Sequence, residues 1–324
     1  MRAAVCPAYG PPEVVRIEDQ REPTLEPGQV MVRVQSAAVN FPDVLLIANQ
    51  YQISVPPPFV PGSEFAGVID AIDSEAEGFV VGDRVTGTGL FGAFAEWVAI
   101  PAATLSRIPD GIDARIAAAF GVAHRTAYHA FRSMARVSPG NEIVVLGAGG
   151  GVGLAAVQLG VALGARVTAV ASSAEKLEAA ASYGATNLLN HGEGELRAAL
   201  RDSLPGGADA VVDPVGGALS EPALRSLRRG GRFVTIGYAS GVIPRIPLNL
   251  VLVKGIQVVG FQFQDVPADE FARNEDELGT LLATGSVTPH IGSSYGLDDT
   301  ARALRQVADG KAIGKILIDV NSQG

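Results

Sequence analysis

Residues 143–153 read IVVLGAGGGVG, and this stretch decides the fold of the chain. An apolar run at 143–146 ends in the glycine-rich loop 147–153, which opens an apolar stretch of helical character at 152–163. A further β-like run, 166–171, comes at the distance that a strand–helix–strand unit requires. Small residues let a backbone approach a pyrophosphate, and the amides and dipole of a helix N-terminus favour its charge. We therefore expect the loop to bind a dinucleotide rather than to form a turn without a ligand, through these residues: Gly147, Ala148, Gly150, Gly151, Val152 and Gly153.

The end of the second β-like run bears on the kind of dinucleotide. NAD-dependent proteins usually carry an acid there that binds the ribose hydroxyls, whereas this chain has Ser172 and Ser173, followed one helical turn later by Lys176. Hydroxyl donors and an ammonium suit a ribose 2′-phosphate. The sequence therefore favours NADPH, although Lys176 also fits an ordinary exposed position at the start of a helix.

The composition excludes several classes of protein. A hydrophobic fraction of 47% with 18% charged residues describes a well-buried globular chain. The net charge of -9 disfavours a nucleic-acid partner, so a small molecule is the expected ligand. No apolar run approaches the roughly 18 residues of a membrane span, and the first residues do not resemble a signal peptide. We therefore expect a cytoplasmic protein without a membrane partner.

The single cysteine, Cys6, excludes intramolecular disulfides and any structural zinc site built from several thiolates. It lies in an expected first strand, 2–6, where a small buried hydrophobic residue is the simplest interpretation.

The length of the chain and the change in its residue pattern near residue 122 predict two domains. Residues 1–121 show short β-like runs between turn residues, at 29–39, 65–72, 84–87 and 93–100, and a proline-rich structured loop at 55–62. Residues 122–264 alternate apolar β runs with helical stretches, as a parallel sheet covered by helices requires. The six expected strands are 142–147, 166–171, 187–189, 208–213, 231–237 and 256–261, with helices starting near 152, 174, 193 and 220. Residues 265–324 have no further partner in that sheet, so we expect them to return to the first domain.

Ordered motifs along nearly the whole chain resemble a known family. They are GPPEVV at 10–15, VNFPD at 39–43, VPGSEFAG at 60–67, VGDRV at 81–85, GGVG at 150–153 with Gln158, and Gly314 with Lys315. In order and spacing they resemble the zinc-independent quinone oxidoreductases of the medium-chain dehydrogenase/reductase superfamily, similar to zeta-crystallin. The resemblance implies an α/β fold: a GroES-like β-rich catalytic domain plus a doubly wound Rossmann domain with a six-stranded parallel sheet. It also implies an active site in the cleft between the two domains.

The resemblance implies a reaction without a metal. Zinc-dependent relatives carry a cysteine where this chain has Asn40, and a histidine where it has Ser63. Neither side chain present is a competent zinc ligand, and the four histidines are scattered without ligand spacing.

The resemblance also implies residues around the cofactor. Asn40 and Thr126 are expected near the nicotinamide ribose and carboxamide, and Lys315 at the nicotinamide end. Residues along the cofactor path are expected to be Asp213, Pro214, Val215, Gly237, Phe261, Gln262 and Phe263.

Three positions depart from the family's pattern. They are Asn141, Val161 and His191. His191 stands where many members have a tyrosine that contacts the 2′-phosphate, so it either replaces that donor or is exposed.

Catalysis without a metal suits an acceptor that is already electrophilic, because positioning then carries most of the rate. We expect Asn40, Tyr51 and Lys315 to serve the reaction, with Tyr51 either at the carbonyl or stacked on a quinone, or else an ordinary core tyrosine. Asp43 is expected to bond the loop after Asn40, and Glu64 to join a buried polar network.

The leading hypothesis is an NADPH-dependent reductase of a quinone or a related enone-type carbonyl. The alternatives are an enoyl-thioester or alkenal reductase, a zinc alcohol dehydrogenase, which Asn40 and Ser63 disfavour, and a non-catalytic NADPH-binding structural protein. The apolar run 251–261 suits edge-to-edge sheet extension between two subunits, so we expect a homodimer.

Overall fold

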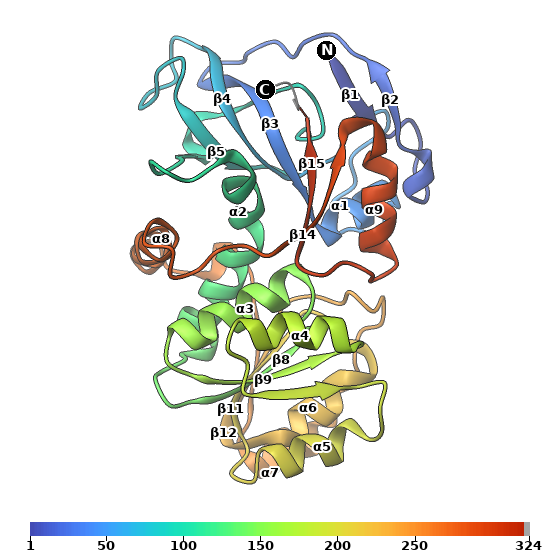
Figure 1. The fold of residues 1–324 in the computed structure, drawn as a ribbon, viewed down its shortest axis with the longest axis vertical. Helices are drawn as coiled ribbons and strands as arrows, with labels where there is room; N and C mark the ends of the chain where they lie inside the picture. Colours follow the sequence, from blue (N-terminus) through green and yellow to red (C-terminus); the bar gives the residue numbers. More distant parts are fainter. Residues whose placement is uncertain (321–324) are drawn as a thin grey trace. The chain divides into compact units, whose positions relative to one another are not determined.

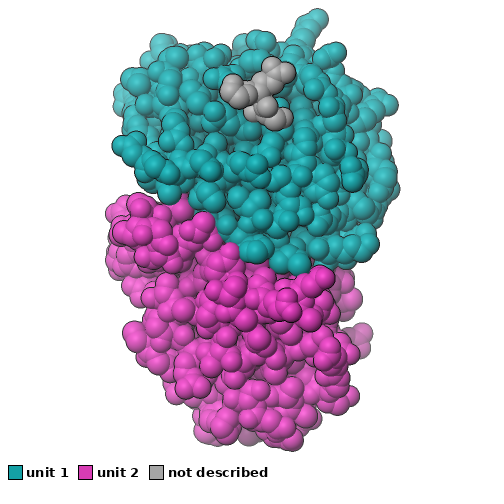
Figure 2. All heavy atoms as spheres, in the orientation of Figure 1, with its two compact units in different colours: residues 1–122, 289–324 teal, residues 123–288 magenta. Residues whose placement is uncertain are grey.

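The computed structural model describes residues 1–320 and divides the chain into two compact units. The first unit combines Met1–Val122 with the segment that starts at Pro289, and the second unit is Ala123–Thr288 (Figure 2). The α2 helix (Ala114–His129) begins in the first unit and ends in the second. Together the two units confirm the expected α/β class, with a β-rich domain and a parallel-sheet domain (Figure 1).

The first unit is built on a seven-stranded sheet in which β3 is central. The strands are β3 (Gln29–Val39), β4 (Glu64–Ile72), β5 (Arg84–Thr88), β6 (Trp97–Pro101), β7 (Leu105–Arg107), β14 (Ile291–Gly296) and β15 (Lys315–Asp319). Their order is β14-β15-β3-β4-β5-β7, with β6 paired to β3. A separate antiparallel pair joins β1 (Arg2–Val5) to β2 (Arg16–Asp19). The remaining helical elements are α1 (Phe41–Ile47), α9 (Thr300–Ala308) and the short η1 (Pro12–Val14), η2 (Ala102–Thr104) and η6 (Leu297–Asp299).

Strand β3 forms where predicted, because its apolar residues face the core over most of its length. The expected strand at 93–100 is shorter in the structure and starts at Trp97. Ala93 and Phe94 instead donate backbone hydrogen bonds to Gly62 and Pro61, and Ala95 bridges to Ala3 of β1, so this segment pairs outside the seven-stranded sheet. Cys6 is buried, as expected, and bridges to Phe59 in the proline-rich segment.

The second unit is a six-stranded, fully parallel sheet in the order β10-β9-β8-β11-β12-β13. The strands are β8 (Glu142–Leu146), β9 (Arg166–Ala171), β10 (Asn187–Asn190), β11 (Ala208–Asp213), β12 (Leu227–Thr235) and β13 (Gln257–Gly260). The helices are α3 (Gly151–Ala162), α4 (Ala174–Ser182), α5 (Leu196–Ser203), α6 (Ser220–Ser226), α7 (Leu248–Lys254) and α8 (Ala268–Ala283). Short elements are the π-helical η3 (Ala130–Ala135) and the turns η4 (Gly217–Leu219) and η5 (Phe263–Asp265).

This strand order reverses direction between β8 and β11, which is the switch point where doubly wound sheets bind ligands beyond the carboxyl ends of their strands. The glycine-rich loop follows β8, and Asp213 ends β11, so both lie at that switch point. Helices α3 and α4 cover one face of the sheet, whereas α5, α6 and α7 cover the other (Figure 1).

The boundary of the returning segment differs from the expected residue 265. Helix α8 belongs to the second unit, and the chain returns to the first unit only at Pro289. The reason is a set of polar contacts from α8 to the end of α2: Tyr128 donates to Glu277, and His129 bonds Glu275 at 2.8 Å. Periodicity along α8 does not reveal these partners.

No helix within residues 1–320 is both long enough and apolar enough to cross a membrane.

Candidate active site

The glycine-rich loop is shaped by a buried strand on one side and a helix on the other. All but the first residue of β8 are fully buried, and Gly147 directly after it adopts a φ of 62°, a left-handed value that favours glycine. The amide of Gly150 donates to the Gly147 carbonyl at 2.9 Å, and Gly150 then caps α3. An α-helix leaves its first amides without intrahelical acceptors, so the N-terminus of α3 offers donors to an anion.

Glycine is sterically required at two further positions of this loop. A Cβ at Gly153 would stand 2.0 Å from the Gly147 carbonyl oxygen, so helix and loop approach too closely for any side chain. A Cβ at Gly149 would stand 2.4 Å from the Cβ of Lys176. The stem of Lys176 therefore lies directly against the loop, a contact that the sequence does not reveal.

The carboxyl end of β9 brings the expected phosphate-binding residues together. Lys176 Nζ donates to Ser172 Oγ at 3.1 Å, and Ser173 Oγ caps α4 by accepting from the Lys176 amide at 3.4 Å. His191 follows β10, where its backbone amide donates to the Ala171 carbonyl at 3.0 Å. Burial lowers the pKa of Lys176 below its usual value, and a bound anion would oppose that shift. Hydroxyls, ammonium and loop thus form one donor-rich surface.

Asp213 organises the loop after β11 rather than presenting a free carboxylate. One carboxylate oxygen accepts from the amides of Val215 at 2.8 Å and Gly216 at 2.7 Å, and the other accepts from Ser220 Oγ at 2.5 Å. The Asp213 carbonyl accepts from Ile236 at 2.9 Å. These bonds hold Val215 beside Gly147, since a Cβ on that glycine would stand 2.6 Å from a methyl of Val215.

The remaining expected cofactor residues of the second unit lie on several segments. Phe261 is buried after β13, with its ring centroid 5.0 Å from that of Phe263 at an interplanar angle of 75°. The Arg125 guanidinium lies 5.6 Å from the Phe263 ring centroid. Thr126 is buried on α2, and Gly237 follows β12, where its amide donates to Asp213 at 3.4 Å.

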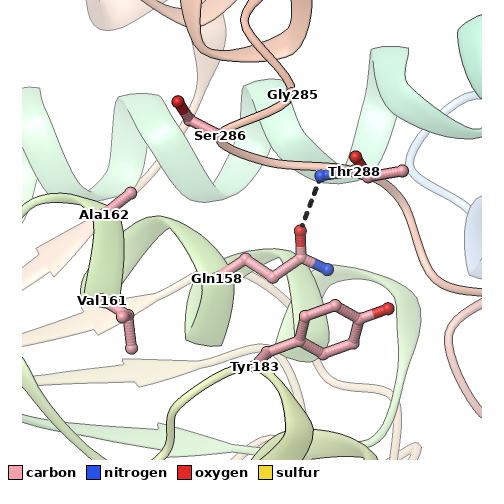
Figure 3. A pocket seen from close by; sticks show the side chains of 7 residues that line it. All are labelled: Gln158, Val161, Ala162, Tyr183, Gly285, Ser286 and Thr288. Carbon is pink, nitrogen blue, oxygen red and sulfur yellow. Dashed lines mark hydrogen bonds between the residues drawn. The ribbon is translucent and has the colours of Figure 1, made fainter.

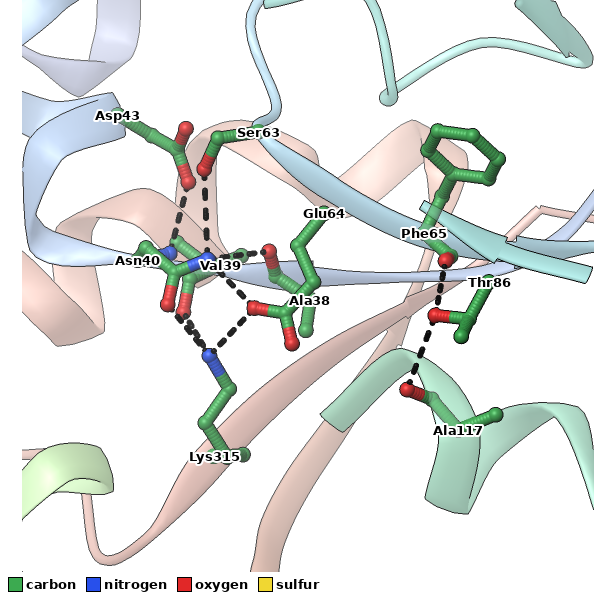
Figure 4. Close-up of polar contacts among 10 residues, drawn as sticks. All are labelled: Ala38, Val39, Asn40, Asp43, Ser63, Glu64, Phe65, Thr86, Ala117 and Lys315. Carbon is green, nitrogen blue, oxygen red and sulfur yellow. Dashed lines mark hydrogen bonds and ion pairs between the residues drawn. The ribbon is translucent and has the colours of Figure 1, made fainter. Parts of the chain in front are cut away.

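A buried polar cluster of Asn40, Glu64 and Lys315 forms at one edge of the first unit's sheet (Figure 4). Asn40 follows the last residue of β3, whereas Glu64 and Lys315 are the first residues of β4 and β15. Both β4 and β15 run antiparallel to β3, so their starts meet its end. Strand pairing therefore joins residues that are 251 and 275 positions apart in the chain.

The Lys315 ammonium is bound on three sides. Its Nζ donates to Asn40 Oδ1 at 2.5 Å, Glu64 Oε2 at 3.2 Å and the Val39 carbonyl at 3.4 Å. The Asn40 amide nitrogen donates in turn to Glu64 Oε2 at 2.8 Å. Because the ammonium faces the amide oxygen and the carboxylate faces the amide nitrogen, the Asn40 side chain has one orientation. Lys315 is 3% exposed and Glu64 0%, so neither charge is compensated by water.

Asp43 and Ser63 extend this cluster. The Asp43 carboxylate accepts from the backbone amide of Asn40 at 2.7 Å. The side-chain nitrogen of Asn40 donates to Ser63 Oγ at 3.4 Å. Burial raises the pKa of Asp43 to about 7, against the opposing effects of the Asn40 amide, Ser63 and Lys315. Near neutral pH the carboxyl is thus partly protonated, which leaves Glu64 and Lys315 as the compensating charges. Asp43 and Glu64 therefore have the structural contacts expected of them.

Tyr51 is not drawn into the cluster. It follows α1 in a turn and packs, half-buried, against the apolar core of the first unit. Its hydroxyl has no hydrogen-bond partner among residues 1–320. Its expected role at a carbonyl stays a prediction.

The donor set at Asn40 and Ser63 does not fit zinc. An amide and a hydroxyl replace the thiolate and imidazole that zinc prefers, and the remaining carboxylate, Glu64, is already paired with an ammonium. Within the described residues, no group of three or more His, Cys, Asp or Glu side chains is arranged to hold a metal ion.

Gln158, from the same motif as the loop, has a structural contact instead. It is buried on α3, and its Oε1 accepts from the Thr288 amide at 3.1 Å beside a hollow of about 280 Å³ (Figure 3). Val161 lines the same hollow. Gln158 thereby ties α3 to the last residue of the second unit.

The comparisons with known proteins agree with this geometry. A model of the alcohol dehydrogenase GroES-like domain matches residues 26–110, and a model of the zinc-binding dehydrogenases matches residues 151–278. The fold and the two matches define a two-domain dehydrogenase.

Relatives narrow this class. The chain is 34% identical to bovine quinone oxidoreductase-like protein 2, over 98% of this chain and 92% of the relative. It is 30% identical to human quinone oxidoreductase, over 98% and 97%. The solved structure of Escherichia coli quinone oxidoreductase, complexed with NADPH, matches with a TM-score of 0.91 and 26% identity, over 99% and 100% of the two chains. The chain therefore belongs to the zinc-independent quinone oxidoreductase family of the medium-chain dehydrogenases/reductases, as its motifs predicted.

The buried ion pair leads to a stability prediction. Replacing Lys315 by Met leaves the Glu64 carboxylate buried without its cation, which we expect to lower the free energy of unfolding by about 3–5 kcal/mol. The double variant Glu64→Gln/Lys315→Met removes both charges and should recover most of that loss. Urea unfolding of the three proteins checks this, and equal losses in the single and double variants would show that the pair is not coupled.

Proposed function

We propose that this protein uses NADPH to reduce a quinone or a related activated carbonyl without a metal ion. The observation that carries the cofactor is the pair Ser172–Lys176 beside the glycine-rich loop. NADPH in the matched Escherichia coli structure and the names of the bovine and human relatives support the proposal.

The second unit supplies the cofactor site in this proposal. Amides at the α3 N-terminus, with the helix dipole, bind the pyrophosphate between Gly147 and Gly153, whereas the Ala148 amide already donates to the Val170 carbonyl at 3.0 Å. Ser172, Ser173, Lys176 and His191 surround the ribose 2′-phosphate.

The nicotinamide half is assigned to residues that the structure shows to be firmly held. Asp213 keeps Val215 in place, and Gly237 lies on the adjoining loop. We assign Thr126 and the edge-to-face pair Phe261 and Phe263 to the same half of the cofactor, where the buried Phe261 would help to exclude water from the reaction.

NADPH supplies the hydride, and the chain's own residues orient the cofactor and the acceptor and polarise the acceptor carbonyl. An acceptor that is already electrophilic needs correct placement more than a Lewis acid. In the proposed mechanism Asn40 lies at the nicotinamide ribose, and Lys315 acts as the positioning residue for Asn40, since all observed contacts of the Lys315 ammonium are to the Val39–Asn40 segment and Glu64. Tyr51 is the proposed contact for the acceptor carbonyl or ring.

The acceptor is tested by steady-state oxidation of NADPH with a panel of quinones and a panel of enoyl thioesters and alkenals. We expect turnover with quinones. Turnover with thioesters alone would replace the quinone by an activated double bond as the substrate. NADPH binding without oxidation by either panel would favour a non-catalytic, structural role.

The choice of cofactor gives a second prediction. Replacing Lys176 by Gln keeps a stem over Gly149 but removes the charge, so NADPH affinity should fall about 10- to 100-fold while NADH affinity stays unchanged. Cofactor fluorescence titration measures both. The control Lys311→Gln removes an exposed lysine of the first unit and should change neither affinity. Equal loss for both cofactors in the Lys176 variant would argue against a 2′-phosphate contact.

We also propose a homodimer formed along β13. This strand is the edge of the parallel sheet, and the preceding helix α7 exposes Leu248 at 76%, Leu252 at 83% and Val253 at 61%. An exposed edge beside an apolar surface suits a second copy of the chain. Light scattering should give twice the mass of 33.4 kDa, and a Leu252→Glu variant should lower it. A wild-type mass of one chain would contradict the dimer.

A further inference from the structure

Three arginines converge on a hollow at the amino end of the parallel sheet. Arg136, Arg228 and Arg232 line it, and its volume is about 280 Å³. It lies where β8, β11 and β12 begin, whereas the glycine-rich loop follows the carboxyl end of β8. The hollow therefore lies at the amino ends of the strands, opposite the carboxyl ends where the proposed cofactor site lies.

A bulge in β12 builds one side of this hollow. Leu227 pairs with Ala208, but Arg232 pairs with Ala210, so four residues stand opposite Asp209 alone. Gly230 makes the turn with a φ of 74°. Bulges re-aim side chains, and this one places Arg228 and Arg232 on the same hollow.

Arg136 forms the other side. It ends the π-helical η3 in the left-handed region, with a φ of 53°. Its guanidinium makes no hydrogen bond or ion pair with any described residue. Arg232, by contrast, donates to the Met134 carbonyl at 3.1 Å, so it is anchored on one nitrogen only.

The charges of the hollow are not balanced by the protein. Asp209 is its single acidic residue; one oxygen accepts from the Glu142 amide at 2.7 Å, and the carboxylate pairs with Arg228. Three guanidinium groups against one carboxylate leave two positive charges in a chain of net charge -9. Burial and the charge of Arg136 lower the pKa of Arg232, and an anion between the two would relieve that repulsion.

We propose that this hollow binds the phosphate monoester group of a small molecule through Arg136, Arg228 and Arg232. A phosphate dianion matches the two uncompensated charges, and planar guanidinium groups match phosphate oxygens in paired hydrogen bonds. The Ser138 and Asn141 side chains at the rim add polar groups for the rest of the ligand. The volume suits a small ligand rather than a dinucleotide.

Calorimetric titration of the full chain at constant ionic strength tests this, with inorganic phosphate and glycerol 3-phosphate as probes. Saturating NADPH is present in one series and absent in the other, because phosphate also suits the cofactor loop. We expect both probes to bind in both series, with glycerol 3-phosphate the tighter. Arg136→Gln should weaken both at least about tenfold. The control Arg201→Gln removes an exposed arginine of the same unit and should change nothing.

Several outcomes would overturn the proposal. No binding of either probe, or an unchanged affinity in the Arg136 variant, removes the site. Binding that disappears when NADPH is added would place phosphate on the cofactor loop instead. Glycerol 3-phosphate binding no tighter than inorganic phosphate would make the ligand the free anion rather than a monoester. The affinity of the Arg136→Lys variant for both probes should lie between those of the wild type and Arg136→Gln, because lysine keeps the charge.

Discussion

The buried ammonium of Lys315 is the contact on which the first unit depends. It joins the ends of three neighbouring strands through Asn40, Glu64 and the Val39 carbonyl. A cation in this apolar surrounding requires acceptors on every side, and the cluster supplies them. The same contacts leave the Asn40 amide one orientation. The pairing of β15 with β3 and the arrangement of the candidate site thus depend on the same contacts.

The second unit depends on a steric constraint rather than on a charge. Gly153 approaches the Gly147 carbonyl so closely that no side chain fits, and this contact brings α3 to the end of β8. Near that junction both carboxylate oxygens of Asp213 accept hydrogen bonds from the segment that follows β11. A rigid loop with donors already in place loses little freedom when an anion binds, which favours affinity.

Much of the fold was predictable because strong local patterns met little tertiary competition. Strands β3, β9 and β11 have the predicted bounds, since most residues of each run are buried. The start of β12 was not predictable, because the bulge opposite Asp209 depends on pairing with β11. Helix α8 joins the second unit through His129 and Tyr128. The sequence of a helix does not predict which residues its single charged side chains will contact.

The candidate site divides in the same way. The sequence by itself determined the glycine loop, the serines and lysine that follow β9, and the replacement of zinc ligands by Asn40 and Ser63, because each is a local choice of residue types. Only the tertiary structure decided that Lys315 binds both Asn40 and Glu64, that Lys176 lies against Gly149, and that three arginines share one hollow. Those contacts join segments far apart in the chain, and their distances are set by strand register and helix packing, which no local pattern contains.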